Sequence, residues 1–358
     1  MRYILAFDSF KGCLSSTEAA DAACQGIRHA DKSAEIQTLS VSDGGEGLVD
    51  AYRQAVGGQL VEMRAHDAMM RRLTAHYLIT PSGKTVIEAA ATCGLALLSE
   101  NERNPMRATS FGIGEMIAHA VVEHGSRQFI IGLGGTATSD CGIGLLQALT
   151  SKITPNGHFD DAYQKVLRTC TFTLACDVDN PLLGTHGAAQ VFARQKGADE
   201  AMIAALERRA EKFAELSAKH FHRDLSQAKG AGAAGGIGYA MMQYLNAEYH
   251  SGADHLLDLL QFETLLDNGQ SIVVTGEGRS DAQTLMGKLP QKIMLRARRK
   301  NVPTWLVSGE LSEPQQLLEA GFEKVVSIRP AHLPLEAAMQ QAVARQNLSD
   351  TMQKLIQK

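Results

Sequence analysis

The chain has 358 residues, enough for two domains of ordinary size and a sizeable core. Hydrophobic residues make up 44% and charged residues 21% of the sequence, which is typical of soluble globular proteins. The 35 basic and 39 acidic residues give a formal net charge of −4, and no basic block exceeds Arg296–Lys300, which argues against nucleic acid as a partner. We interpret that basic block as a solvated helix end.

The six cysteines are scattered and form no C-x-x-C pair, which is typical of reduced thiols in a cytoplasmic protein. The apolar run Tyr3–Phe7 stops at Asp8, so it is too short for a signal peptide or a membrane span. We therefore expect a cytoplasmic protein without a membrane partner.

The first sixty residues follow the rhythm of a doubly wound α/β sheet. Their predicted order is a strand (Arg2–Phe7), a polar loop (Asp8–Gly12), a helix (Glu18–His29), a second strand (Glu35–Val41) and a glycine-rich loop (Ser42–Gly47). Ser15 and Glu18 have the spacing of a capping box, which predicts the start of the helix.

From about residue 60 the pattern changes. Leu73–Ile79 and Thr85–Ala90 flank Pro81-Ser82-Gly83, which predicts a hairpin and hence antiparallel pairing. Antiparallel pairing indicates a second domain inserted into the first. We place the first domain at 1–62 and 270–358, and the inserted mixed α/β domain at 63–269.

The inserted segment contains a strand–turn–helix unit. A helix is expected over Ser110–Glu123, a strand ends with Phe129–Ile131, and another helix begins near Gly142 with Ser139 or Asp140 as its cap. The turn between them holds glycines and hydroxyl side chains, so its backbone N–H groups could approach an anion closely. The alternative is that these glycines only turn the chain tightly.

The remaining elements are short strands and amphipathic helices. A strand over Phe172–Cys176 leads into Asp177–Pro181, a scaffold helix covers Asp199–Phe221, and the Gly/Ala-rich run Ala228–Gly238 precedes a helix from Tyr239. The α/β rhythm then returns with strands at Ser271–Val274, Thr304–Val307 and Lys324–Ile328, a helix holding Lys292–Lys300, and a helical tail from Leu335.

Several strands of the α/β portion end in polar, mostly acidic loops. These loops are Asp8–Lys11, Ser42–Glu46, Thr275–Asp281 and Ser308–Glu310. In open α/β sheets ligands bind outside the carboxyl ends of the strands, so these loops predict the functional site. Carboxylates beside lysines and an anion-binding turn indicate Mg²⁺ with a nucleotide, and hence phosphoryl transfer.

Common nucleotide motifs are mostly absent. No G-x-x-x-x-G-K-[ST] sequence occurs, and His222-Arg223-Asp224-Leu225 lacks the partners of a protein-kinase catalytic loop. Gly132–Ala137 fits a relaxed dinucleotide fingerprint and Gly230–Gly235 a strict one. A nicotinamide-dependent hydroxy-acid dehydrogenase and a non-catalytic ligand-binding protein are therefore retained as alternatives.

An ordered set of motifs from residue 8 to about 310 resembles the glycerate kinase family. The matching segments are Asp8–Gly12, Ser42–Gly47, Gly132–Asp140, Ala175–Gly184, Gln195–Ala198, Gly230–Gly238, Thr275–Asp281, Gln283-Thr284 and Gly287-Lys288. The chain departs from the family's common pattern at Thr136, Ser139 and Cys141, which replace Ser, Asn and Gly, and at Arg194, where the family often has Pro.

The resemblance implies a kinase that uses ATP and Mg²⁺ to phosphorylate D-glycerate in glyoxylate, glucarate or galactarate utilisation. The usual product would be 2-phosphoglycerate, and 3-phosphoglycerate stays open. It also implies a discontinuous, flavodoxin- or Rossmann-like parallel-sheet domain with a mixed α/β domain inserted. A homodimer is left open.

These considerations assign roles to individual residues. We expect Asp281, or else Asp43, to be the base, with Lys11 and Lys288 on the transferred phosphate. Arg279 is expected to hold the glycerate carboxylate, with Ser9 and Glu277 also at the substrate. Asp8 and Asp43, in competition with Asp177 and Asp179, are expected near Mg²⁺. The nucleotide is expected to contact Gly132, Gly134, Gly135, Thr136, Thr138, Asp140 and Lys196.

Each carboxylate has a simpler alternative role as a helix cap or as an acceptor that orders a loop. Because Gly132–Asp140 falls in the inserted domain, we expect it to supply only part of the site and to approach the acidic strand ends when the domains close.

Overall fold

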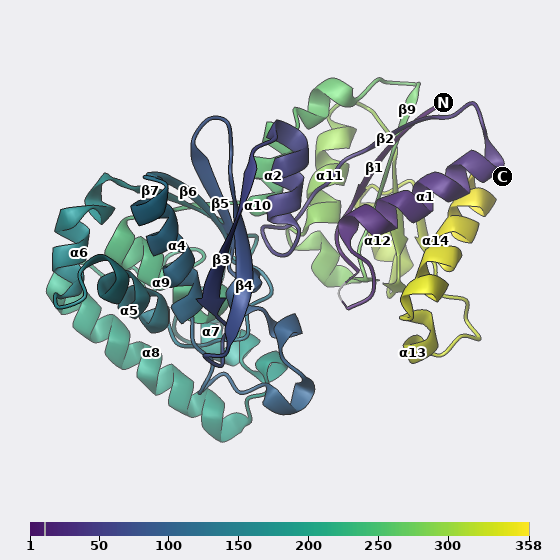
Figure 1. Cartoon of the computed structure of the whole chain (residues 1–358). Coiled ribbons are helices and arrows are strands. Elements are labelled where there is room, and N and C mark those ends of the chain that lie inside the picture. The colour runs from purple at the N-terminus through teal and green to yellow at the C-terminus, as the bar shows by residue number, and fades with distance from the viewer. Residues whose placement is uncertain (11, 358) are drawn as a thin grey trace. The chain divides into compact units, whose positions relative to one another are not determined.

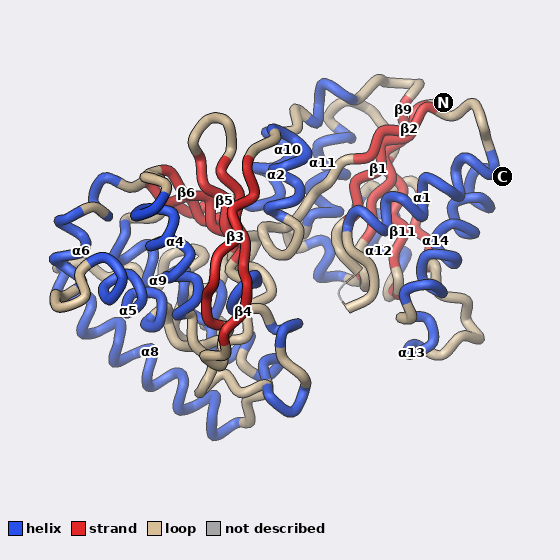
Figure 2. The backbone as a smooth tube through the Cα atoms, in the orientation of Figure 1, coloured by secondary structure: helices blue, strands red, loops and turns tan. Residues whose placement is uncertain are grey.

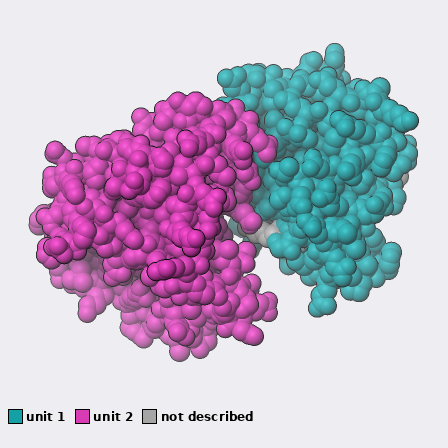
Figure 3. Space-filling model, viewed as in Figure 1, with its two compact units in different colours: residues 1–43, 253–358 teal, residues 44–252 magenta. Residues whose placement is uncertain are grey.

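The computed structural model describes residues 1–10 and 12–357. It divides into two compact units, coloured separately in Figure 3: residues 1–43 with 253–358 form unit 1, and residues 44–252 form unit 2. The boundaries expected from the sequence lay after residues 62 and 269. Helix α2 (Leu48–Val56) falls in unit 2 because it packs against strands β4 and β5 of that unit.

The described part of unit 1 contains a five-stranded sheet in the order β13-β11-β9-β1-β2, with every neighbouring pair parallel. Its strands are β1 (Arg2–Phe7), β2 (Glu35–Thr38), β9 (Ser271–Gly276), β11 (Thr304–Ser308) and β13 (Lys324–Ser327). Counted along unit 1 this is order 2-1-3-4-5, which is the flavodoxin-like arrangement. The predicted parallel-sheet fold class is confirmed.

The central strands of unit 1 are almost continuously apolar because helices cover the sheet. The helices in the described part of unit 1 are α1 (Ser16–Ala30), α10 (Gly252–Leu259), α11 (Leu289–Arg298), α12 (Pro314–Ala320), α13 (Leu335–Ala338) and α14 (Gln341–Ile356), together with the short 3₁₀ helices η5 (Phe262–Leu265) and η6 (Ala282–Leu285). Helices α1 and α14 lie side by side (Figure 1), and Ile27 and Met352 are buried in the same core cluster as Phe7 and Val307.

The predicted start of α1 is confirmed. The Ser15 hydroxyl accepts the N–H of Glu18 at 3.2 Å, and the Glu18 carboxylate accepts the N–H of Ser15 at 2.9 Å. This reciprocal capping box satisfies two N–H groups that the first turn of a helix leaves without partners.

Within its described residues, unit 2 contains a six-stranded mixed sheet in the order β3-β4-β5-β6-β7-β8, visible as red strands in Figure 2. Its strands are β3 (Gln59–His66), β4 (Arg72–Ile79), β5 (Lys84–Glu88), β6 (Gln128–Gly132), β7 (Thr171–Ala175) and β8 (Glu248–His250). Strands β3, β4 and β5 pair antiparallel, and β5 to β8 pair parallel. The predicted hairpin around Pro81–Gly83 is confirmed.

Strand β3, over Gln59–His66, is not predicted by the sequence pattern. This edge strand exposes half of its residues, including Glu62, and buries only Val61 and Ala65. Its hydrophobic alternation is therefore weak, and its pairing with β4 decides its conformation.

The helices of unit 2 pack on both the sheet and each other. They are α2, α3 (Ala90–Cys93), α4 (Phe111–Glu123), α5 (Ile143–Ile153), α6 (Phe159–Lys165), α7 (Ala188–Phe192), α8 (Glu200–Phe221) and α9 (Ala233–Leu245). Short 3₁₀ helices lie at η1 (Leu95–Leu97), η2 (Glu100–Glu102), η3 (Leu167–Thr169) and η4 (Arg194–Lys196). The core includes the stacked rings of Phe129 and Phe172, whose centroids are 5.0 Å apart.

The prediction of a solvated basic helix end is wrong for Arg296. This residue is only 8% exposed, because α11 turns it toward the acidic side chains of α10 and η5. Its guanidinium contacts Glu263 through two hydrogen bonds, of 2.5 and 2.8 Å, and also pairs with Asp258.

None of the helices in the described part of the chain has the length and apolar character needed to cross a membrane.

Candidate active site

The candidate site of unit 1 lies at the carboxyl ends of β9 and β11. Beyond these ends the chain forms a short parallel pair, β10 (Arg279–Ser280) with β12 (Glu310–Leu311). A Cβ at Gly276 would lie 1.8 Å from the carbonyl oxygen of Val307, so only glycine allows this close approach. This glycine therefore lets the loops after β9 and β11 come together. The acidic residues at the ends of these strands predicted that the two loops would meet.

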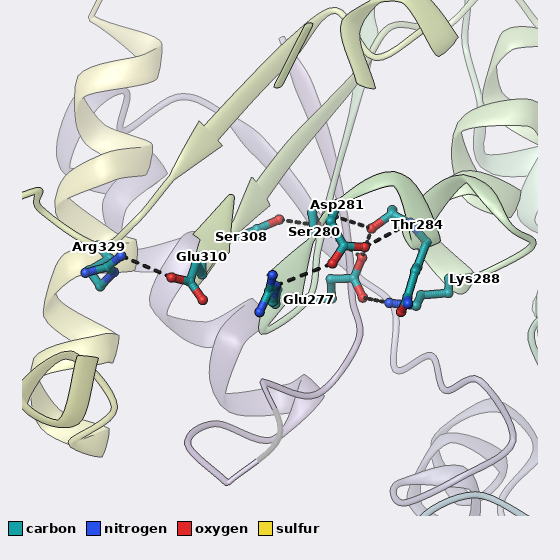
Figure 4. Close-up of polar contacts among 10 residues, drawn as sticks. Glu277, Ser280, Asp281, Thr284, Lys288, Ser308, Glu310 and Arg329 are labelled. Atoms are coloured by element: carbon teal, nitrogen blue, oxygen red, sulfur yellow. Dashed lines mark hydrogen bonds and ion pairs between the residues drawn. The ribbon is translucent and has the colours of Figure 1, made fainter. Parts of the chain in front are cut away.

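The carboxylate of Glu277 is the centre of a hydrogen-bond network in these loops (Figure 4). Glu277 is 7% exposed. Its Oε1 accepts the hydroxyls of Ser280 at 3.1 Å and Thr284 at 2.6 Å, and its Oε2 lies 3.4 Å from the ammonium of Lys288. These partners compensate the cost of burying a charge.

Asp281 is the N-cap of η6. Its Oδ1 accepts the N–H of Gln283 at 2.9 Å, and its Oδ2 lies 3.4 Å from Nε of Arg279. The N–H of Asp281 donates to the hydroxyl of Thr284 at 3.1 Å. Asp281 thus has the capping role that the sequence analysis named as its alternative, and its side chain remains 22% exposed.

A pocket of about 310 Å³ opens beside Asp281. Its lining residues are Arg279, Asp281, Ala282, Gln283, Ser312 and Glu313. A larger pocket of about 510 Å³ runs along α8 in unit 2, but none of the predicted site residues lines it. We therefore regard the smaller pocket, which holds a carboxylate and a guanidinium, as the candidate substrate pocket.

Lys288 and Asp8 lie at the same edge of the unit 1 sheet. Lys288 is the N-cap residue of α11, and its side chain is 41% exposed beside Glu277. Asp8 follows β1 directly, is 8% exposed, and accepts the N–H of Ser9 at 2.8 Å. Asp43 closes the first segment of unit 1 and is half-buried. Lys11, also predicted here, lies outside the described residues.

The predicted nucleotide turn, Gly132–Asp140, lies in unit 2 after β6. Much of it is occupied by internal contacts: the N–H groups of Gly134 and Ala137 donate to the carbonyls of Gly44 and Cys93 at 3.3 and 2.7 Å. Gly134 and Gly135 remain accessible at the surface, whereas Gly132, Thr136, Thr138 and Asp140 are buried.

Asp140 organises the start of two helices. Its carboxylate accepts the N–H groups of Ser110 at 2.8 Å, Gly142 at 3.0 Å and Gly144 at 3.1 Å, and the Ser110 hydroxyl at 2.9 Å. The residue at the N-cap position of α5 is Gly142, which has no side chain to act as a cap. The side chain of Asp140, two residues before this position, therefore caps the N-terminus of α5.

Thr138 and Lys196 join this buried cluster. The hydroxyl of Thr138 donates to the carbonyl of Ala108 at 2.7 Å, and the ammonium of Lys196 donates to the carbonyl of Thr138 at 2.6 Å. Lys196 is only 3% exposed, and burial lowers its pKa to about 8, against the opposing effects of Cys93 and Asp140. The hydroxyl of Ser139 is buried without a hydrogen-bond partner among the described residues.

The glycine-rich run before α9 packs against the same turn. Ala234, Gly235 and Gly236 have positive φ values inside α9, and a Cβ at Gly235 would lie 2.2 Å from the carbonyl oxygen of Thr138. Gly230–Gly235 follows no strand in the described structure, so its match to a dinucleotide fingerprint has a packing explanation.

The carboxylates predicted near Mg²⁺ have the hard oxygen donors that this ion prefers. Asp8 and Asp43 belong to unit 1, and the half-buried Asp177 belongs to unit 2. No group of three or more His, Cys, Asp and Glu side chains gathers as a metal site among the described residues. Magnesium is often held by one or two carboxylates together with substrate phosphates, so the donor set fits the ion without forming a complete cage.

Sequence reasoning did not assign roles to Thr284 and Arg329. The Asp281-x-x-Thr284 spacing is that of a capping box, and it could have indicated the link between these two residues. Arg329 follows β13 at the same edge of the sheet and pairs with Glu310 at 3.1 Å, apart from the Glu277 network (Figure 4).

The parallel sheet, the pocket at its carboxyl edge and the pair of Glu277 with Lys288 are typical of an α/β enzyme that acts on a small ligand. The sequence model of the family described as "Glycerate kinase family" matches residues 3–358 of the chain. The chain belongs to the glycerate kinase family and is therefore an ATP-dependent kinase. The predicted family is confirmed, and the dehydrogenase and non-catalytic alternatives are set aside.

Individual relatives agree with this assignment. The chain is 35% identical to the glycerate kinase of Bacillus subtilis (strain 168), over 96% of this chain and 94% of the relative. It is 36% identical to the glycerate 2-kinase of Escherichia coli (strain K12), over 92% and 90%. The crystal structure of a candidate glycerate kinase 2 from Salmonella typhimurium LT2 matches with a TM-score of 0.76 and 33% identity, over 99% of this chain and 97% of that one.

Proposed function

We propose that this kinase transfers the γ-phosphoryl group of ATP to the 2-hydroxyl of D-glycerate, giving 2-phosphoglycerate and ADP. Support for the 2-position comes from the similarity to the E. coli relative named glycerate 2-kinase. The observation that carries the chemistry is the position of Asp281 in a pocket that also contains Arg279, next to the Glu277–Lys288 pair.

Asp281 is the proposed base. As the substrate oxygen forms its bond to the γ-phosphorus, the bond from that phosphorus to the oxygen bridging to ADP breaks, and the hydroxyl proton passes to the Asp281 carboxylate. Asp43 stays the second candidate. Arg279 is proposed to bind the glycerate carboxylate, because a guanidinium matches a carboxylate with two parallel donors. Ser9 stays a predicted substrate contact.

Lys288 is proposed to neutralise charge on the transferred phosphoryl group. Its ammonium is 41% exposed while one side faces Glu277, so it can reach a ligand without losing that partner. Lys11 stays a prediction for the same function.

For Mg²⁺ we propose Asp8 and Asp43 as ligands, with Asp177 as the competing candidate. The ion would neutralise the charge of the nucleotide phosphates. For the nucleotide we propose contacts at Gly134 and Gly135, the accessible part of the predicted turn. The cytoplasmic location, the role in glyoxylate or glucarate utilisation and a homodimer stay predictions.

The substrate and product can be tested directly. The purified chain, incubated with ATP, Mg²⁺ and D-glycerate, should give a new phosphorus NMR signal with the shift and proton coupling of authentic 2-phosphoglycerate. A 3-phosphoglycerate signal would overturn the assigned position, and the absence of any phosphorylated product would overturn the proposed substrate.

The base assignment has its own test. Asp281→Asn should fold normally and lower kcat by about 10²- to 10⁴-fold, because an amide cannot accept the hydroxyl proton. Asp43→Asn is the matched comparison, and a larger loss there with near-normal turnover in Asp281→Asn would transfer the role to Asp43.

A further inference from the structure

Glu277 faces into the protein rather than toward the pocket. Its side chain is 9% exposed, whereas that of Asp281 is 22% exposed, and Glu277 is absent from the residues that line the pocket beside Asp281. Its described partners are two hydroxyls and one ammonium from its own unit. Glu277 is predicted at the substrate from the sequence, but these contacts favour another role.

The directions of the hydrogen bonds follow from the chemistry of a carboxylate. An ionised carboxylate only accepts, so the hydroxyl protons of Thr284 and Ser280 both point at Glu277. The oxygen of Thr284 then presents a lone pair to the N–H of Asp281 at 3.1 Å. Glu277 therefore fixes the orientation of the hydroxyl that holds the Asp281 backbone.

The network also reaches β11. Ser280 and Ser308 lie 2.6 Å apart through their hydroxyl oxygens, and the Ser280 proton is already donated to Glu277. Ser308 must then donate to Ser280. One carboxylate thus ties together the end of β11, strand β10, the start of η6 and the side chain of Lys288, and connected hydrogen bonds of this kind strengthen one another.

We propose that Glu277 is the positioning residue of this site: it orients Asp281 through Thr284, holds the ammonium of Lys288, and is not itself a ligand of the substrate. The inference rests on the proposed function, because Asp281 and Lys288 are the groups proposed to act on the substrate hydroxyl and the phosphoryl group. Glu277 acts on the reaction through these two groups.

The hydrogen bonds that connect Glu277 to Asp281 through Thr284 are tested with Thr284→Val. This variant keeps the shape of the side chain but removes its hydrogen-bond donor and acceptor. We expect kcat to fall about 10- to 100-fold, since small misplacements of a catalytic group have effects of this size. KM for glycerate should stay within about threefold, because no substrate contact is lost. Thr284→Ser, which restores the hydroxyl, should recover kcat to within about threefold of the original.

The contact between Glu277 and the ammonium of Lys288 is tested with Glu277→Gln. The amide oxygen can still accept from Ser280 and Thr284, whereas the amide nitrogen would face the Lys288 ammonium and displace it. We expect kcat to fall about 10-fold or more with little change in KM for glycerate. A raised KM with unchanged kcat would show Glu277 to be a substrate ligand and would overturn the proposal.

Glu323→Gln provides the matched control. Glu323 also accepts a side-chain hydrogen bond, from the indole N–H of Trp305 at 3.1 Å, but it precedes β13 and so lies at the amino edge of the sheet. This variant should keep kcat and KM. Thermal unfolding of all variants, compared with the control, separates loss of turnover from loss of fold.

Amide hydrogen exchange measures the positioning without any assumption about the substrate. The Asp281 N–H should lose protection in Thr284→Val and regain it in Thr284→Ser. Unchanged protection in Thr284→Val would overturn the proposal even if the enzyme phosphorylates glycerate. Failure of the original chain to phosphorylate glycerate would instead contradict the proposed function and leave the exchange result to decide the positioning role.

Discussion

At the scale of single residues, Asp140 stabilises the turn Gly132–Asp140 through the hydrogen bonds that its side chain accepts. It accepts three backbone N–H groups and the hydroxyls of Ser110 and Thr109 while only 3% exposed. A carboxylate surrounded by donors in this way holds its charge through hydrogen bonds, and each bond to a charged group contributes more than a neutral one. A structural role of Asp140 therefore predicts a loss of stability when the carboxylate is changed, whereas a role at the nucleotide predicts a change in KM for ATP.

Asp140→Asn should lower the free energy of unfolding by about 2 kcal/mol, because the amide replaces one accepting oxygen with a donor that faces other donors. Chemical denaturation measures this change. Asp160→Asn, which alters an exposed carboxylate of α6, is the control and should change stability by less than about 0.5 kcal/mol. A raised KM for ATP without loss of stability would instead place Asp140 at the nucleotide.

Glu88 is another carboxylate of unit 2 with an internal role. Its Oε1 accepts the N–H of Val49 at 2.7 Å at the start of α2. Burial is the main reason why the pKa of Glu88 is raised to about 7; the Val49 hydrogen bond opposes this shift, and the charges of Asp50 and Glu46 contribute to it. The folded state therefore binds the Glu88 proton more tightly than the unfolded state, whose pKa is near the ordinary 4.5.

The sign of the pH dependence follows from this difference. The stabilising contribution of protonated Glu88 is complete below pH 4.5 and is lost as the pH rises through about 7. Glu88→Gln stays neutral, so its stability relative to the original chain should increase by about 3 kcal/mol between pH 4.5 and pH 8. Denaturant unfolding at several pH values measures the difference, and Glu62→Gln, on exposed β3, should show none. A pH-independent difference for Glu88→Gln would contradict the assignment.

At the scale of secondary structure elements, Arg296 joins α11 to α10 and η5. Its side chain is 10% exposed, while its partners Asp254, Glu263 and Asp258 are 47%, 31% and 71% exposed. Water therefore screens the acidic ends of these pairs, and the bidentate contact with Glu263 is the strongest of them.

Arg296→Met should destabilise unit 1 by about 2 kcal/mol, because it removes a buried charge while its acidic partners remain close together. Arg296→Lys should lose about half as much, since an ammonium cannot form the paired contact with Glu263. Lys300→Met alters an exposed residue in the turn that follows the same helix and should have little effect. Equal stabilities for Arg296→Met and Lys300→Met in urea unfolding would show that these ion pairs contribute nothing.

At the scale of the whole molecule, local sequence patterns predicted the individual strands and helices better than they predicted which of them pair or pack together. The buried strands β1, β6, β7, β9 and β11 were recognised because apolar runs ended at glycine or acidic residues. The exposed strand β3 was not recognised, since its conformation depends on pairing with β4. The buried position of Arg296 depends on packing between helices distant in sequence, which a single charge pattern does not encode.

The candidate site shows the same limit. The sequence placed Glu277, Asp281 and Lys288 in one group of loops, because the carboxyl ends of parallel strands share one edge. It did not distinguish the inward Glu277 from the accessible Asp281, since both are carboxylates in one short loop. That distinction arises from the hydroxyls of Thr284, Ser280 and Ser308, whose directions only the folded loops determine.

The organisation into units leads to a last prediction. Residues 44–252 form one continuous segment with its own sheet and core, so we expect this fragment to fold alone and to unfold cooperatively in urea. The matched fragment 63–269 lacks α2, which packs against β4 and β5, and should be clearly less stable. Amide exchange should show β6 and β7 protected in fragment 44–252 as in the whole chain. Equal stability of the two fragments would favour the boundaries at 62 and 269, and the absence of a cooperative transition in 44–252 would show that this segment depends on unit 1.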